Sequence, residues 1–125
     1  MKVLAHFCKM EPEKEVDPNY LYKIFLEDLK KSYENAGGVK AVNGAVGALK
    51  GLREGSIKVG LQTGYEPELA RKVATMTGLI DNCDHITTAT ESGKGRPAPY
   101  MIFDFMKATQ LMDLKTIAKV GDTSP

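Results

Sequence analysis

The feature that most constrains this sequence is a regular alternation of helical and strand patterns over residues 42–122. Patterns typical of helices are found at 42–55, 66–78 and 96–112, and Val42 and Leu52 of the first are predicted to face inward. Each of these stretches is followed by a pattern typical of a short strand, at 57–63, 85–90 and 115–122. Helices and strands that alternate in this way are typical of a parallel sheet covered by helices. We therefore predict an α/β fold with three strands, whose ligands bind beyond the carboxyl ends of the strands.

The first third of the chain has a different, purely helical pattern. Residues 17–38 carry apolar residues on one helical face, with Asp17 as a predicted N-cap, Pro18 at the first helical position and a Gly37-Gly38 pair as the end signal. Residues 1–10 are predicted to be another helical piece, joined to this helix by a polar connector.

Composition excludes several function classes. The 125 residues suit one domain, and a net charge of +1 gives no basic patch for nucleic acid or for an acidic membrane surface. There is no apolar run of about 18 residues, which a membrane-spanning helix needs. The spacing of the only two cysteines, Cys8 and Cys83, does not match that of cysteine ligands in a metal site. We interpret them as reduced thiols of a cytoplasmic protein.

Polar residues of three kinds follow the three predicted strands. Thr63 and Gly64 come after the first, Lys94 and Arg96 lie in the loop after the second, and Asp122 ends the third. A hydroxyl, a free backbone N–H and a helix beginning at Pro67 can donate to phosphoryl oxygens. A cation neutralises the charge that develops on such a group, and a carboxylate is a suitable ligand for Mg²⁺. Together these residues predict a phosphate site with a metal ligand.

Each residue taken singly also has an ordinary structural interpretation. A Thr-Gly pair after a strand is usually a simple turn, lysine and arginine in loops are usually solvated, and Asp122 can cap a helix that follows it. The pattern is specific only because all three features occur at successive strand ends.

The strings "GLQTGY", "GKGRPAPYMIF" and "IAKVGDT" occur in an order that resembles the haloacid dehalogenase superfamily, in its phosphonatase branch. The resemblance covers residues 40–125 well and implies a partial three-layer Rossmann-like parallel sheet. Residues 1–38 resemble the later part of the α-helical cap of this branch, so the implied domains are cap remainder at 1–38 and incomplete hydrolase core at 39–125.

The resemblance also implies residue roles. Thr63 and Gly64 would hold the phosphoryl group, Arg96 would supply the cation in preference to Lys94, and Asp122 would bind Mg²⁺. An aspartate would attack phosphorus, and the aspartyl-phosphate would then be hydrolysed. In this branch a cap lysine first forms a Schiff base with the aldehyde of phosphonoacetaldehyde, because an iminium is an electron sink that makes the C–P bond breakable.

The sequence departs from the family pattern at both ends. No N-terminal strand with an aspartate nucleophile precedes the cap region, and no acidic residue follows Asp122. Lys2 is the candidate for the Schiff-base lysine, Lys9 fits the register less well, and an exposed terminal lysine is the alternative interpretation of Lys2. We therefore expect a segment of a longer hydrolase that is inactive by itself.

The resulting functional prediction is a Mg²⁺-dependent phosphonatase-like hydrolase that cleaves the C–P bond of phosphonoacetaldehyde. The alternatives are a phosphomonoester phosphatase of the same superfamily and a non-catalytic remnant without the nucleophile. The expected partners are a small phosphorylated or phosphonate substrate, no nucleic acid and no membrane. An unfinished sheet edge would also allow two copies to associate as a homodimer.

Overall fold

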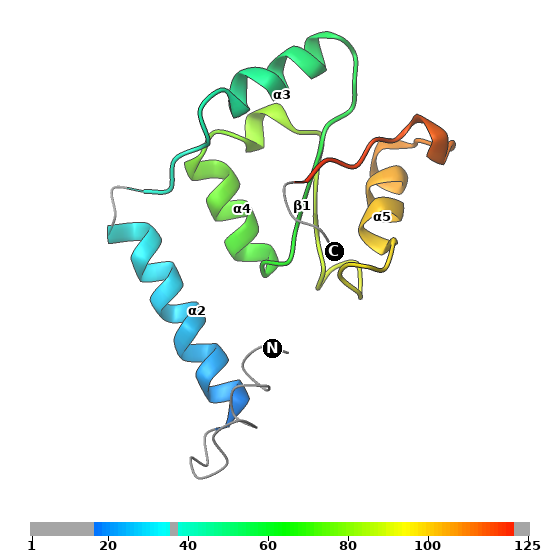
Figure 1. Cartoon of the computed structure of the whole chain (residues 1–125). Helices are drawn as coiled ribbons and strands as arrows, with labels where there is room; N and C mark the ends of the chain where they lie inside the picture. Colours follow the sequence, from blue (N-terminus) through cyan, green and yellow to red (C-terminus); the bar gives the residue numbers. More distant parts are fainter. Residues whose placement is uncertain (1–16, 36–37, 122–125) are drawn as a thin grey trace. The chain divides into compact units, whose positions relative to one another are not determined.

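A computed structural model of the chain describes residues 17–35 and 38–121. The chain divides into two compact units, Met1–Val39 and Lys40–Pro125. In the first unit, helix α2 spans Pro18–Asn35 (Figure 1). The predicted N-cap is confirmed, because Asp17 Oδ1 accepts a hydrogen bond from the Asn19 N–H at 2.9 Å. No helix among the described residues is long and apolar enough to cross a membrane.

The second unit contains two strands and three α-helices among its described residues. They are α3 (Ala45–Glu54), β1 (Gly60–Thr63), α4 (Pro67–Met76), β2 (His85–Thr88) and α5 (Tyr100–Thr109), with short 3₁₀ turns η1 (Ile80–Asn82) and η2 (Leu114–Thr116). The strands are parallel, and Thr63 is in register with Thr88. Helices α4 and α5 lie on opposite sides of the strand pair (Figure 1). This helix–sheet–helix layering confirms the predicted α/β class as a partial Rossmann-like fold.

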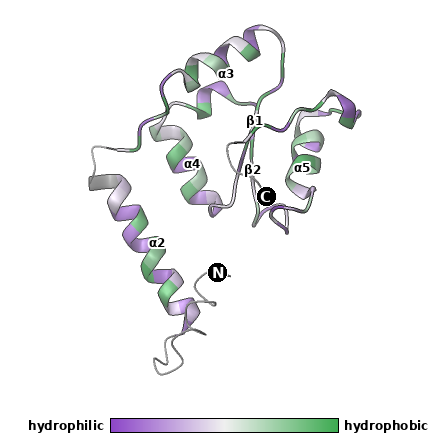
Figure 2. Cartoon of the chain, viewed as in Figure 1, coloured by the Kyte–Doolittle hydropathy of each residue, from purple (hydrophilic) through white to green (hydrophobic). Residues whose placement is uncertain are grey.

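The core of this unit lies between the strands and the two helices that flank them. Leu69, with only 1% of its surface exposed, packs from α4 together with Ala70 and Ala74, and the small alanines let this helix approach the sheet closely. On the other side α5 buries Met101 and Phe105, which are four residues apart and so share one face. Hydrophobic residues recur along α5 (Figure 2).

One close approach fixes α5 against β1. A Cβ added to Gly60 would lie 2.5 Å from Cδ2 and 2.7 Å from Cε2 of the Phe105 ring. The ring therefore occupies the space that any other residue at position 60 would need. Glycine here weakens the strand intrinsically but allows the aromatic ring to pack on the backbone.

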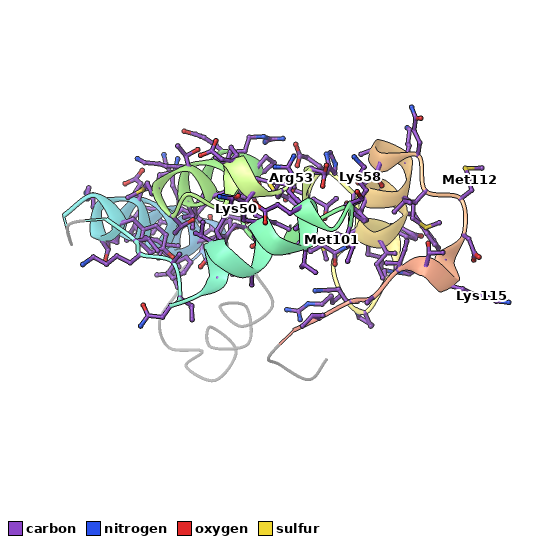
Figure 3. All side chains as sticks on the ribbon, turned by 90° about the horizontal axis from the view of Figure 1, so that it is seen from above. Lys50, Arg53, Lys58, Met101, Met112 and Lys115 are labelled. Carbon is purple, nitrogen blue, oxygen red and sulfur yellow. The ribbon has the colours of Figure 1, made fainter. Side chains whose placement is uncertain are left out.

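Asp84, directly before β2, anchors the beginning of β1. Its Oδ2 accepts the Val59 N–H at 2.8 Å, and its Oδ1 accepts from Lys58 Nζ at 3.3 Å. Arg53 at the end of α3 also reaches this carboxylate, with Nε 3.8 Å from Oδ2. Figure 3 labels the side chains of Arg53 and Lys58, the two cations of this contact. The Val59 N–H, followed by the two cations, lowers the pKa of Asp84. These contacts join α3, β1 and β2 at the amino ends of the strands.

Three expectations about local structure are wrong. The strand predicted over 115–122 is absent from its described part, where η2 is followed by extended chain at 117–121. A strand needs a hydrogen-bonded neighbour, and this stretch has none among residues 17–35 and 38–121. Two residues predicted to face inward are exposed instead: Val42, at 81%, precedes α3, and Leu52, at 42%, lies within it.

Candidate functional site at the carboxyl ends of the strands

Thr63 and Gly64 form the turn that leaves the carboxyl end of β1. Thr63 Oγ1 accepts a hydrogen bond from the Tyr65 N–H at 3.1 Å, so its oxygen takes part in a local turn while its hydroxyl proton remains available as a donor. Gly64 is exposed, and a Cβ at this position would meet nothing within 4 Å. The turn therefore leaves open space beside the hydroxyl. Helix α4 begins three residues later at Pro67.

A second turn leaves the carboxyl end of β2 and is held by Thr88. The Thr88 side chain is fully buried, at 0% exposure. Its Oγ1 donates to Glu91 Oε2 at 2.9 Å and accepts from the Glu91 N–H at 3.2 Å. The other carboxylate oxygen, Oε1, accepts from Arg71 Nη2 of α4 at 2.6 Å. The turn is thereby tied both to its own strand and to a neighbouring helix.

The loop that carries the two candidate cations continues from this turn. Ser92 Oγ donates to Asp104 Oδ2 of α5 at 2.6 Å, which ties the loop to that helix. Farther along, a Cβ added to Gly95 would lie 3.1 Å from the Ala89 Cβ, so the chain folds back on itself at this point. Lys94 and Arg96 lie on either side of Gly95, and both are exposed.

A hydrogen bond links the loops after the two strands. Thr90 Oγ1 donates to Glu66 Oε2 at 3.2 Å, and Glu66 is the N-cap residue of α4. Because β1 and β2 are parallel and Thr63 is in register with Thr88, both loops begin at the same end of the sheet. The structure thus brings Thr63 and Gly64 to the same edge as the loop of Lys94 and Arg96.

Two predicted site residues, Lys2 and Asp122, lie outside the described residues, so their roles stay predictions. Within the described part of the chain, no group of three or more histidine, cysteine, aspartate or glutamate side chains is arranged to hold a metal ion.

The carboxylate of Glu91 has its pKa shifted by its hydrogen-bond partners. Its hydrogen bonds with Arg71 and then Thr88 are the main causes that lower its pKa, and the nearby His85 adds to them. Glu91 is therefore held as the carboxylate and is committed to fixing the loop. Cys83, before β2, has a raised pKa because of its burial, which disfavours the reactive thiolate.

A groove of about 830 Å³ runs along the edge of β1 that does not pair with β2. One side is formed by residues 56–62 and another by residues 116–120, and its lining includes Leu49, Leu52, Ile102 and Phe105. The groove thus brings the segment that leads toward Asp122 near β1. It does not include Thr63 or Arg96 in its lining.

The network that fixes the second loop was not predicted. Sequence analysis gave no role to Thr88, Glu91 or Arg71. Thr88 and Glu91 nevertheless have the T-x-x-E spacing, which often marks a cap in which each side chain bonds the other residue's backbone. That spacing was the available signal. Arg71 lies 20 residues from Glu91, and no local pattern connects residues so far apart.

Comparison with known proteins gives the family. A family model described as haloacid dehalogenase-like hydrolase matches residues 4–124. The chain belongs to the haloacid dehalogenase-like hydrolase family. The resemblance inferred from the three strings above is therefore confirmed at this level.

Among curated proteins, the chain is similar to phosphonoacetaldehyde hydrolases. It is 33% identical over 114 residues to the enzyme of Bacteroides fragilis, a match that covers 89% of this chain. It is 36% identical over 114 residues to the enzyme of Lysinibacillus sphaericus, a match that covers 88% of this chain. It is also 30% identical to a bifunctional phosphonoacetaldehyde hydrolase/aminoethylphosphonate transaminase of Clostridioides difficile, over 87% of this chain and 17% of that protein. The chain spans 41% of the length of the first two relatives. No solved structure matches it significantly.

Proposed function

We propose that this chain contributes the phosphoryl-binding edge of a phosphonatase-like hydrolase that acts on phosphonoacetaldehyde. The observation that carries the proposal is the register of Thr63 with Thr88, which starts both candidate phosphate-binding loops at one end of the sheet. The similarity to phosphonoacetaldehyde hydrolases supports the substrate assignment. Cys83 is a free cysteine, which is compatible with action in the cytoplasm, and this location is also part of the proposal.

In this proposal the two loops make different contacts with the phosphoryl group. The Thr63 hydroxyl and the Gly64 backbone donate to phosphoryl oxygens from the β1 side, where the absence of a Cβ leaves room for them. Arg96 supplies positive charge from the β2 side, because a guanidinium presents several donors in a fork that matches phosphoryl oxygens. Lys94 is the second candidate for that role. Asp122 is the proposed ligand of Mg²⁺, which would supply charge neutralisation when bound.

The proposed substrate requires a Schiff-base step that a phosphomonoester phosphatase does not use. An unprotonated lysine amine, for which Lys2 is the candidate, would add to the aldehyde carbon and lose water to give an iminium. Borohydride delivers a hydride to that iminium carbon and leaves a stable secondary amine, so it traps the step covalently.

The test is reductive trapping of this polypeptide with phosphonoacetaldehyde, read by peptide mass spectrometry. We expect one dominant adduct at Lys2, absent in Lys2→Arg and retained in the matched control Lys9→Arg. Acetaldehyde, which has no phosphonate for the strand-end loops to hold, should label weakly and without preference. Equal labelling of many lysines by both aldehydes would contradict the phosphonoacetaldehyde assignment and favour the phosphatase alternative.

A further inference from the structure

A second hollow, of about 380 Å³, lies at the edge of β2. Its lining takes Arg71 from α4, His85 to Thr87 from β2, and Asp104 and Lys107 from α5. Since α4 and α5 lie on opposite sides of the strands, a hollow that touches both must sit at the strand edge between them. Thr63, Gly64, Lys94 and Arg96 do not line it, so it is separate from the proposed phosphoryl edge.

The acidic groups of this hollow are already hydrogen-bonded within the protein. Both oxygens of Glu91, which also lines it, accept hydrogen bonds, Oε1 from Arg71 at 2.6 Å and Oε2 from Thr88 at 2.9 Å. Asp104 Oδ2 accepts from Ser92 Oγ at 2.6 Å. Glu91 is therefore already paired with a cation, whereas Asp104 keeps its negative charge and an oxygen, Oδ1, that accepts no hydrogen bond within the described residues.

The nitrogen-bearing groups are not committed in the same way. Within residues 17–35 and 38–121, the Lys107 amine makes no hydrogen bond or ion pair, and the His85 imidazole makes no hydrogen bond. Arg71 uses Nη2 for Glu91, which leaves other N–H groups of its five-donor guanidinium available. Three donors from three different elements thus line one hollow, together with one carboxylate, Asp104, that no cation pairs with among the described residues.

We propose that this hollow binds a small oxyanion, a carboxylate or phosphate group, through Arg71, His85 and Lys107. The guanidinium offers a planar fork suited to two oxygens of such a group, and the ammonium adds a point charge. A volume of 380 Å³ lies at the lower end of the range for small-molecule sites and suits a small ligand. The site lies beyond the proposed function and does not depend on it.

The experiment is an amide NMR titration of the 125-residue polypeptide with inorganic phosphate and, separately, with acetate, at constant ionic strength. We expect saturable shifts at residues 85–87 and 104–108 with at least one of the two anions. Whichever anion binds more tightly identifies the preferred source of the oxyanion. The double variant His85→Gln, Lys107→Gln should weaken this binding by about tenfold or more, since both side chains lose a charge-assisted hydrogen bond to the anion.

Two control variants test whether anion binding is specific to this hollow. Lys50→Gln removes a lysine from exposed α3 and should leave the affinity unchanged, and Thr63→Val should also leave the shifts at residues 85–87 intact. Within residues 17–35 and 38–121, the side chains of His85 and Lys107 make no hydrogen bond, so we expect the double variant to fold, and circular dichroism checks this. Linear, non-saturating shifts with both anions, or equal loss in Lys50→Gln, would overturn the proposal. Loss of these shifts in Thr63→Val would show that they report on the other edge and would overturn it too.

Discussion

Arg71 of α4 donates from Nη2 to Glu91 Oε1 at 2.6 Å and thereby clamps the loop after β2 to the helix that follows β1. Both partners are substantially exposed, at 52% and 39% of their side-chain surface, so solvent screens the pair. A pair of this kind contributes about 0.2–1 kcal/mol to stability. Its larger consequence is geometric, because the clamped loop is the one that carries Lys94 and Arg96.

The lowered pKa of Glu91 makes this clamp sensitive to acid. A carboxylate whose folded pKa lies below its unfolded pKa stabilises the fold above the unfolded pKa, near 4.5, and loses that contribution as the pH falls through the folded pKa. Glu91→Gln keeps an oxygen acceptor for Thr88 but removes the charge. We expect it to lower the free energy of unfolding by about 1 kcal/mol or less at pH 7. In urea titrations the difference should shrink below pH 4.5, and a difference that is the same at pH 7 and pH 3 would contradict this account.

Gly60→Ala should destabilise the second unit by about 1–3 kcal/mol, the usual cost of overpacking a core. The new methyl group would collide with the Phe105 ring, at 2.5 Å from its nearest atom. Thermal or urea unfolding measures the effect. Gly47→Ala is the matched control, because a Cβ there meets nothing within 4 Å and alanine favours the helix. Combining Gly60→Ala with Phe105→Leu should cost less than the sum of the two single changes, and strict additivity would argue against the contact.

The edge of β1 that faces the large groove should govern association of this polypeptide. Among the described residues, β1 pairs only with β2, and each buried backbone group left without a partner costs about 1–3 kcal/mol. Total stability is only about 5–15 kcal/mol, so a few such groups have a large effect. We expect self-association or rapid amide exchange along this edge. Analytical ultracentrifugation with hydrogen exchange tests it, and a monomer with strongly protected amides at residues 57–62 and 116–120 would refute it.

The sequence predicted the order of elements well because its local signals agreed with one another. Pro67 at the first turn of α4 and Asp17 before α2 occupy the expected positions, and the two strands that form are the ones flanked by predicted helices on both sides. The strand expected at 115–122 has the right composition. Strand formation also requires a neighbour, however, and a local pattern carries no information about whether one is available.

The candidate site was likewise predictable only in part. Thr63, Gly64, Lys94 and Arg96 follow directly from strand ends, and the parallel register places their loops at one edge as expected. The residues that hold those loops in place were not predictable, because Arg71 with Glu91 and Glu66 with Thr90 are contacts between elements. Burial of helix faces was also misjudged, as exposed Val42 shows, since periodicity identifies a stripe without saying what covers it.

The most direct test of the central claim is a phosphate titration of the polypeptide followed at the amides of Gly64 and Tyr65 and of residues 94–96. The account predicts saturable shifts at both loops, lost in Thr63→Val, weakened about tenfold or more in Arg96→Gln and less in Lys94→Gln. Gly64→Ala should weaken binding without changing stability, because its methyl group meets open space in the protein but fills the space proposed for the phosphoryl group. A folded polypeptide whose amides at residues 64–65 and 94–96 do not respond to phosphate would contradict the claim that this edge binds a phosphoryl group.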